Sequence, residues 1–150
     1  IDAGRMAPSA MNQQPWKFYV VKDRKIIASI SAAIRKMAES FFLFSNGAEL
    51  PESSDRIFYD APLVIFLVGP KGDEWTALDI GMCAQNMMLA AKSLGLDTCP
   101  VGFAKFIMQT SEYSRLKLNE SEQVYLALAI GYGDETPKVH ERIKENVIYI

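Results

Sequence analysis

The residues best suited to hold a ligand lie in segment 8–15, near the start of the sequence. A proline at each end of this segment fixes its own φ and restricts the residue before it, so residues 8–14 are expected to form an ordered, non-helical loop. Its polar side chains are a hydroxyl and carboxamides, from Ser9, Asn12, Gln13 and Gln14. Such uncharged groups suit a flat, neutral heterocycle that alternates donors and acceptors. The alternative is a capped turn in which Ser9 and Asn12 only satisfy nearby backbone groups.

A glycine turn provides the second segment that could contact a ligand. Gly95 is the expected end of a helix, residues 97–101 are expected to be extended, and Gly102 follows them. Because it has no Cβ, Gly102 lets the backbone come close to a planar ligand.

Three apolar runs predict the strands that must position these segments. Residues 18–21 are apolar on both faces, which predicts a strand buried on both sides. Residues 63–68 form an unbroken apolar run, which predicts a central strand. Residues 123–132 predict the last core strand. Its apolar residues expected on one face are Val124, Leu126, Leu128 and Ile130.

Two long helices are expected between the strands. Asp23 is the predicted N-cap of an amphipathic helix that ends at Asn46-Gly47. The helix 74–94 is apolar almost all round, which predicts burial on more than one side. Its small residues are Ala77, Gly81, Ala84 and Ala91. They would let another helix approach closely, either from a second copy of the chain or through packing within one chain. Gln85 and Asn86 on this helix are expected to make structural hydrogen bonds. Residues 111–118 are expected to form a short helix.

The polar stretch 45–60 predicts a mobile loop near the entrance of the site. The aromatic residues that flank it are Phe42, Phe44, Phe58 and Tyr59. They could shape a substrate pocket, and simple packing is the alternative.

Composition limits the classes of protein that this chain can belong to. With 150 residues, 49% of them hydrophobic, it can form one domain with its own core. A net charge of −2, with scattered basic residues, gives no reason to expect a nucleic-acid partner. The apolar helical run 80–91 is shorter than the roughly 20 residues of a membrane span. No signal-peptide pattern is present, so we expect a cytoplasmic protein.

Motifs in which side chains themselves carry the chemistry are absent from the sequence. It has no Gly-x-Ser-x-Gly, His-Glu-x-x-His or P-loop motif and no paired carboxylates in an apolar setting. His140, the only histidine, is expected on the surface. Cys83 and Cys99 are expected to be reduced, small hydrophobic residues rather than redox or metal sites.

Four motifs, in the same order along the chain, resemble the FMN-dependent nitroreductase family of NAD(P)H oxidoreductases. They are Pro8-Ser9-x-x-Asn12-x-Gln14-Pro15-Trp16 with its following strand, the helix 79–95, the turn Asp97-Thr-Cys-Pro-Val-Gly102, and Ala129-Ile-Gly-Tyr-Gly-Asp-Glu-Thr-Pro137. The resemblance implies an α+β fold, a three-layer αβα sandwich around a mainly antiparallel sheet, as one domain over residues 1–150. It also implies an intertwined homodimer in which the C-terminal strand 147–150 is exchanged between subunits.

The resemblance also implies an FMN site that two subunits share. The residues that match family contacts are Pro8, Ser9, Ala10, Asn12, Gln14, Pro100, Val101, Gly102 and Arg142. A main-chain N–H near Gly102 would donate to flavin N5. Which residue provides this N–H stays open within one position, because Phe103 stands where the family often has a second glycine. Arg142, rather than Lys138, better matches the family's phosphate contact, since its planar fork suits bidentate binding. The alternative is an arginine that contacts only water.

The start of the sequence bears on the phosphate site. Ile1, Ala3 and Met6 are spaced as at the end of a helix, and no initiator Met is present, so we expect a further segment upstream. In the family that segment carries an Arg-x-Ser-x-Arg-like motif for the flavin phosphate, which has no equivalent here.

The activity implied by the resemblance is ping-pong transfer from NAD(P)H, through FMN, to a nitroaromatic or quinone-type acceptor. No catalytic side chain is assigned, because the protein need only bind, aim and tune the cofactor. The Gly-rich dinucleotide fingerprint is absent, so NAD(P)H is expected as a transient reductant. One alternative is other flavin chemistry on the same fold, namely dehalogenation or flavin consumption. The other is a flavin-free dimeric structural or regulatory protein.

Overall fold

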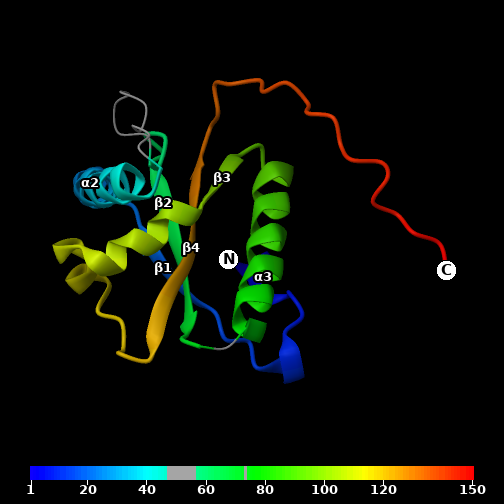
Figure 1. The fold of residues 1–150 in the computed structure, drawn as a ribbon, viewed down its shortest axis with the longest axis horizontal. Coiled ribbons are helices and arrows are strands. Elements are labelled where there is room, and N and C mark those ends of the chain that lie inside the picture. Colours follow the sequence, from blue (N-terminus) through cyan, green and yellow to red (C-terminus); the bar gives the residue numbers. More distant parts are fainter. Residues whose placement is uncertain (47–56, 73) are drawn as a thin grey trace.

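The computed structural model describes residues 1–46, 57–72 and 74–150, with the backbone alone for 41–46. Its elements form three layers, with α2 on one side of a sheet and α3 on the other (Figure 1). In chain order they are α1 (Asp2–Arg5), η1 (Ala10–Asn12), β1 (Lys17–Val21), α2 (Arg24–Asn46), β2 (Leu63–Pro70), α3 (Glu74–Ser93), β3 (Asp97–Val101), η2 (Gly102–Gln109), η3 (Ser111–Leu116) and β4 (Glu122–Gly131), where η denotes a 3-10 helix.

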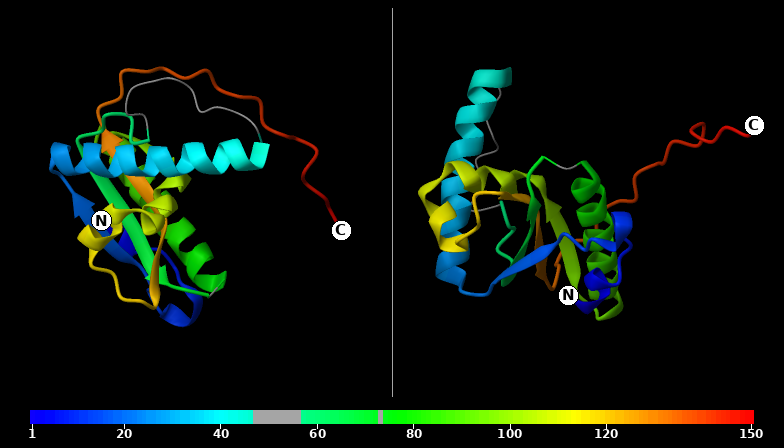
Figure 2. Two further views of the ribbon diagram at one scale, coloured as in Figure 1. Left: turned by 60° about the vertical axis from the view of Figure 1, so that its left-hand side comes forward. Right: turned by 90° about the horizontal axis from the view of Figure 1, so that it is seen from below.

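The middle layer is a sheet with the strand order β1-β2-β4-β3. Each neighbouring pair is antiparallel. The α+β fold with an antiparallel sheet is therefore confirmed, and β2 is the central strand that its unbroken apolar run predicts. Helix α2, with η2 and η3, covers one face of the sheet, and α3, with α1 and η1, covers the other (Figure 2).

Each face of the sheet has its own hydrophobic core. On the α2 side, Ile30 and Ile34 are buried together with Phe66 of β2. On the α3 side, Ile80 is buried with Leu67, the next residue of the same strand. Successive residues of β2 therefore point into opposite cores, as the pleat of a strand requires. Burial on both faces explains why the run 63–68 contains no polar residue.

Strand β1 is at the edge of the sheet, so the expectation of burial on both sides is wrong. Tyr19 and Val21 pack against the α2-side core and Phe18 against the α3-side core. Val20, however, remains 43% exposed. The sequence pattern of two apolar faces does not distinguish a central strand from an edge strand, because only the neighbouring strand decides it.

Strand β4 contains a bulge, so its apolar residues do not all lie on one face as expected. Leu126 pairs with Leu67 and Val124 with Val68, so Tyr125 is an additional residue between two paired positions. An extra residue reverses the alternation of faces beyond it. As a result Val124 lies in the α2-side core, whereas Leu126, Leu128 and Ile130 lie in the α3-side core.

Within one chain α3 is buried on one side, not on more than one. Ala84 and Ala91 face the sheet, whereas Gly81 is exposed, so the small residues do not form one stripe. The opposite face carries large apolar side chains that are 39% to 61% exposed, namely Trp75, Leu78, Met82 and Leu89. The helix ends in a Schellman turn, in which Gly95 has φ +76° and the Leu96 N–H donates to the Ala91 carbonyl (3.0 Å).

The start of α2 agrees with the sequence. Asp23 caps it, since its Oδ1 accepts the N–H groups of Lys25 (2.8 Å) and Ile26 (3.3 Å). The exit at Gly47, most of the expected loop 45–60 and the side chains of Phe42 and Phe44 lie outside the described residues. Phe58 is fully buried and meets Phe66 edge to face, with ring centroids 5.8 Å apart. Simple packing is therefore the correct interpretation for Phe58.

The 3-10 helix η2 begins at Gly102, directly after β3, in a segment for which the sequence analysis predicts no element. The expected short helix is present as η3, and the chain then turns with the Glu122 N–H donating to the Asn119 carbonyl (2.9 Å). Beyond β4 the chain leaves the body as an arm (Figure 1), and residues 132–150 are all exposed. Among the described residues, the segment 147–150 joins no strand, so its exchange onto a partner's sheet stays a prediction.

Candidate functional site

The loop 8–14 adopts an uncommon backbone shape. It contains the short turn η1, so it is not entirely non-helical as expected. Met11, Asn12 and Gln14 have positive φ angles of 50°, 56° and 48°. For residues with a Cβ this region costs about 1–2 kcal/mol each. Contacts within the loop and from the rest of the chain must therefore hold it in this conformation.

Two hydrogen bonds inside the loop help to hold it. The Gln14 N–H donates to Ser9 Oγ (2.9 Å), and Gln14 Nε2 donates to Asn12 Oδ1 (3.1 Å). Ser9 thus satisfies a nearby backbone group, as in the capped-turn alternative. Asn12 and Gln14 are nevertheless exposed, so both carboxamides face outward where a ligand could meet them.

Both ends of the loop are fixed in the α3-side core. Ala7 precedes the loop and Trp16 follows it, and they are 7% and 8% exposed. Gly69 of β2 lies close to the same place, because a Cβ built on it would come within 3.3 Å of the Pro15 carbonyl oxygen. The loop therefore projects from a rigid base.

A third support of the loop is Asp79, which the sequence analysis did not select. Its side chain is buried, at 2% exposure, on the second turn of α3. The Ala10 N–H donates to both of its carboxylate oxygens, at 3.1 and 3.2 Å. The signal that could have found it is a carboxylate inside an otherwise apolar helix, since a buried carboxylate needs a hydrogen-bond donor.

The glycine turn, the second candidate segment, lies at the end of β3. Val101 is 6% exposed and points into the α2-side core, whereas Pro100 and Gly102 are exposed. Apart from its chain neighbours and the nearby backbone of η2, no heavy atom of the described residues lies within 4 Å of the place where a Cβ on Gly102 would be. The backbone of Gly102 is therefore open to a flat ligand, as its residue type predicts.

Within one chain the loop and the turn are apart. Asp79 holds the loop near the first turns of α3, whereas β3 begins just after α3 ends. Figure 1 shows η1 at the lower end of α3 and β3 leaving from its upper end. The turn follows the far end of β3, whereas the loop leads into β1. These strands lie at opposite edges of the sheet with two strands between them, about 14 Å apart at about 4.8 Å per strand. One chain does not bring these candidate residues together.

Arg142 lies on the exposed C-terminal arm, away from both segments in this chain. Its Nη1 donates to the His140 carbonyl (3.1 Å), and Lys138 and His140 are exposed beside it. The arm is fixed at its start, where the Gly133 N–H donates to Asp97 Oδ2 (3.2 Å) and Lys92 Nζ pairs with Asp97 Oδ1 (2.7 Å). These contacts lower the pKa of Asp97, the Lys92 hydrogen bond most of all.

Neither cysteine has the properties of a reactive thiol. Cys83 is buried in the α3-side core, and burial raises its pKa to about 11. Burial likewise raises the pKa of Cys99, and the charge of this thiol, when ionised, raises the pKa of its hydrogen-bonded neighbour Tyr59. Both thiols are free. Among the described residues no group of His, Cys, Asp or Glu side chains could hold a metal ion.

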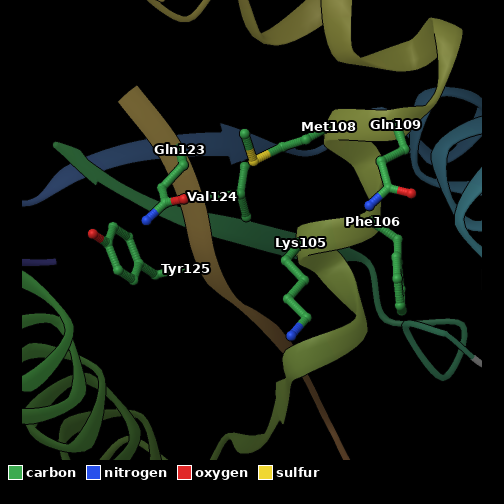
Figure 3. A pocket seen from close by; sticks show the side chains of 7 residues that line it. All are labelled: Lys105, Phe106, Met108, Gln109, Gln123, Val124 and Tyr125. Carbon is green, nitrogen blue, oxygen red and sulfur yellow. The ribbon is translucent and has the colours of Figure 1, made fainter. Parts of the chain in front are cut away.

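A cavity of about 570 Å³ lies between η2 and the first residues of β4 (Figure 3). Its lining residues are Lys105, Phe106, Met108, Gln109, Gln123, Val124 and Tyr125. None of the candidate flavin contacts is among them. The Tyr125 hydroxyl donates to the Pro70 carbonyl (2.6 Å), which fixes this ring between β4 and the end of β2.

Comparison with known proteins identifies the class. The model of the Nitroreductase family matches residues 1–132, so this chain belongs to that family. A 4-nitrobenzoate reductase from Pseudomonas putida is 27% identical over 175 aligned positions, which cover 93% of this chain and 76% of the relative. An iodotyrosine deiodinase from Thermotoga neapolitana is 25% identical over 152 positions, covering 95% of this chain and 79% of that protein.

Solved structures agree on the fold. A nitroreductase with bound FMN from Desulfitobacterium hafniense superposes with a TM-score of 0.80 at 23% identity, over 99% of this chain and 82% of that one. In the described part of the chain, no helix is both long and apolar enough to cross a membrane.

Proposed function

We propose that this protein is an FMN-dependent oxidoreductase that takes electrons from NAD(P)H and passes them to nitroaromatic or quinone-type acceptors in a ping-pong sequence. The observation that carries the proposal is the family match over residues 1–132, which includes both the loop and the glycine turn. The similarity to a 4-nitrobenzoate reductase supports the acceptor class. The solved relative with bound FMN supports the cofactor.

The described residues fit an isoalloxazine ring. Asn12 and Gln14 present exposed carboxamides, which can both donate and accept, as the pyrimidine edge of a flavin requires. The open space at Gly102 lets a planar ring lie against the backbone, where an N–H can donate to it. Arg142 could meet the phosphate through its guanidinium. These contacts are neutral around the ring and cationic at the phosphate, which matches the charge of FMN.

We propose that two copies of the chain build each site, the loop of one facing the glycine turn of the other. The separation of these segments across the sheet supports this arrangement, because the loop precedes β1 at one edge and the turn follows β3 at the other. The exposed apolar face of α3 supports pairing through this helix. The apolar end of the arm, in which Ile148 is 84% exposed, supports its exchange onto the partner.

When bound, FMN supplies the group that accepts hydride from a nicotinamide and returns electrons to the acceptor. The protein's own part is to position and to tune. Backbone N–H groups near Gly102 would stabilise negative charge on the ring, and they cost no reorganisation because the turn is already formed. The carboxamides of the loop would fix the pyrimidine edge and set the plane of the ring.

The test is an absorption spectrum, followed by kinetics. The protein, supplied with FMN and freed of excess by gel filtration, should absorb visible light and run as a dimer. It should then oxidise NADH or NADPH in the presence of a nitroarene or a quinone, with the parallel double-reciprocal lines of a ping-pong reaction. A colourless protein after this treatment contradicts the proposal and favours a flavin-free protein. A yellow monomer contradicts the shared site.

A second candidate activity is reductive dehalogenation by the same cofactor. It is favoured by the similarity to an iodotyrosine deiodinase, which covers 95% of this chain. The two activities are distinguished by supplying a halogenated tyrosine in place of the nitroarene and measuring halide release. Release of halide at a rate above that of nitro reduction would make dehalogenation the function.

A further inference from the structure

The buried carboxylate of Asp79 is not explained by the packing of its own helix. The neighbouring residues of α3 that face the sheet are apolar or small, including Ile80, Cys83 and Met87. An apolar residue could pack at position 79 without the cost of burying a carboxylate. The carboxylate instead takes the Ala10 N–H on both oxygens, across 69 residues of sequence.

Ala10 occupies the position in the loop where such a contact has the greatest effect. It is the first residue of η1, and the two residues after it, Met11 and Asn12, have positive φ. Fixing the peptide N–H of Ala10 fixes where this left-handed turn begins. The direction of the Asn12 side chain follows from the backbone angles of Ala10, Met11 and Asn12. The hydrogen bond from Gln14 to Asn12 then holds that side chain.

We infer that Asp79 is a positioning residue for the flavin site: its buried carboxylate, through the Ala10 N–H, sets the loop so that the Asn12 carboxamide faces the ligand. This inference rests on the proposed function. Asp79 itself touches no ligand. Without its acceptor, the loop would relax toward ordinary backbone angles, and Asn12 would be presented in many directions rather than one.

The experiment compares FMN affinity and thermal stability in four proteins: wild type, Asp79→Ala, Asp79→Asn and the control Asn86→Ala. Asn86 is a matched control because it too ties α3 to the N-terminal segment, donating from Nδ2 to the Ala3 carbonyl (3.2 Å) at a distance from the loop. Asp79→Ala should weaken FMN binding up to about fivefold, the loss expected when the Asn12 carboxamide itself is removed, because Asp79 acts through that side chain. Asp79→Asn keeps one acceptor oxygen and should restore most of the affinity. Asn86→Ala should bind FMN like the wild type.

A double-mutant cycle with Asn12→Ala separates positioning from general support. If Asp79 acts through Asn12, then Asp79→Ala should cost little further affinity once Asn12 is already alanine. Equal losses in both backgrounds, or unchanged affinity of Asp79→Ala, would overturn the inference. If Asp79→Ala does not fold, the same cycle with Asp79→Asn decides, by whether its smaller loss disappears without Asn12. A wild type that binds no FMN would instead refute the proposed function.

Discussion

Asn12 is the residue that the proposed site uses most directly. Its carboxamide is exposed, held by Gln14, and carried on a left-handed backbone that few residue types adopt as readily as asparagine. Asn12→Ala should therefore weaken FMN binding by about 1 kcal/mol, roughly fivefold in Kd, as for one hydrogen bond left unmade. Titration of flavin fluorescence would measure it. Gln109→Ala, which removes an exposed carboxamide from η2, is the control, and equal Kd values for the two variants would remove Asn12 from the site.

A partly buried ion pair, in which Lys17 is exposed and Glu122 is buried, ties the strand after the loop to β4. Glu122 is 6% exposed and accepts hydrogen bonds from Lys17 Nζ and the Asn119 N–H. The Lys17 hydrogen bond lowers the pKa of Glu122 from its usual 4.5, and Glu122 raises the pKa of Lys17 above 10.5. Glu122 thus stabilises the fold above its ordinary pKa, and this contribution is lost as pH falls through the lower pKa of the folded state. Lys17 stabilises below its ordinary pKa and loses its effect as pH rises through the raised value.

Removal of the Glu122 carboxylate should make the free energy of unfolding depend less on pH in the acid range. Wild-type protein should lose unfolding free energy between pH 5 and pH 3, because the unfolded chain takes up the Glu122 proton first. Glu122→Gln has no carboxylate to protonate in this range. It should have a lower free energy of unfolding than the wild type at pH 7, and that free energy should fall less between pH 5 and pH 3. Urea unfolding at several pH values measures both. If the variant loses as much stability in acid as the wild type, the ion pair does not contribute to the pH dependence.

Among the elements, α3 has two faces with different roles. One face packs on the sheet and holds the loop through Asp79, and the other exposes Leu78 and its apolar neighbours. Leu78→Arg should place a charge in the proposed subunit contact and weaken association about tenfold or more, given about 1.5–3 kcal/mol for a buried leucine. Sedimentation velocity would detect the monomer, and flavin should be lost with it. Gln109→Arg, which places the same charge on the exposed surface of η2, is the control, and an unchanged dimer in Leu78→Arg would show that this face is not the interface.

The elements also show where sequence patterns suffice and where they do not. The unbroken run of β2, the Asp23 cap of α2 and the glycine stop of α3 were predictable because each depends on residues next to one another in the chain. The edge position of β1 and the bulge at Tyr125 were not, because they depend on which strand lies alongside. At the site, the exposed carboxamides of Asn12 and Gln14 followed from composition, whereas the role of Asp79 required knowing that α3 returns to the loop.

For the whole molecule, the separation of the loop and the glycine turn in one chain makes a prediction about mixed dimers. If each flavin lies between the loop of one copy and the turn of the other, a defect in the loop and a defect in the turn damage different halves of a site. Asn12→Ala changes only the loop half. Gly102→Leu fills the open space beside the turn and changes only the other half.

A heterodimer of these two variants, isolated with two affinity tags, should contain one site with both defects and one with neither. It should therefore bind about one FMN per dimer with wild-type affinity, although each parent homodimer binds weakly at both sites. Equilibrium titration with FMN, monitored by flavin absorbance, gives the stoichiometry directly. The tagged wild-type dimer, which should bind about two FMN per dimer, is the control. If the heterodimer has no site of wild-type affinity, each site is built from the loop and turn of a single chain, and their separation across the sheet must then be closed by a rearrangement within that chain.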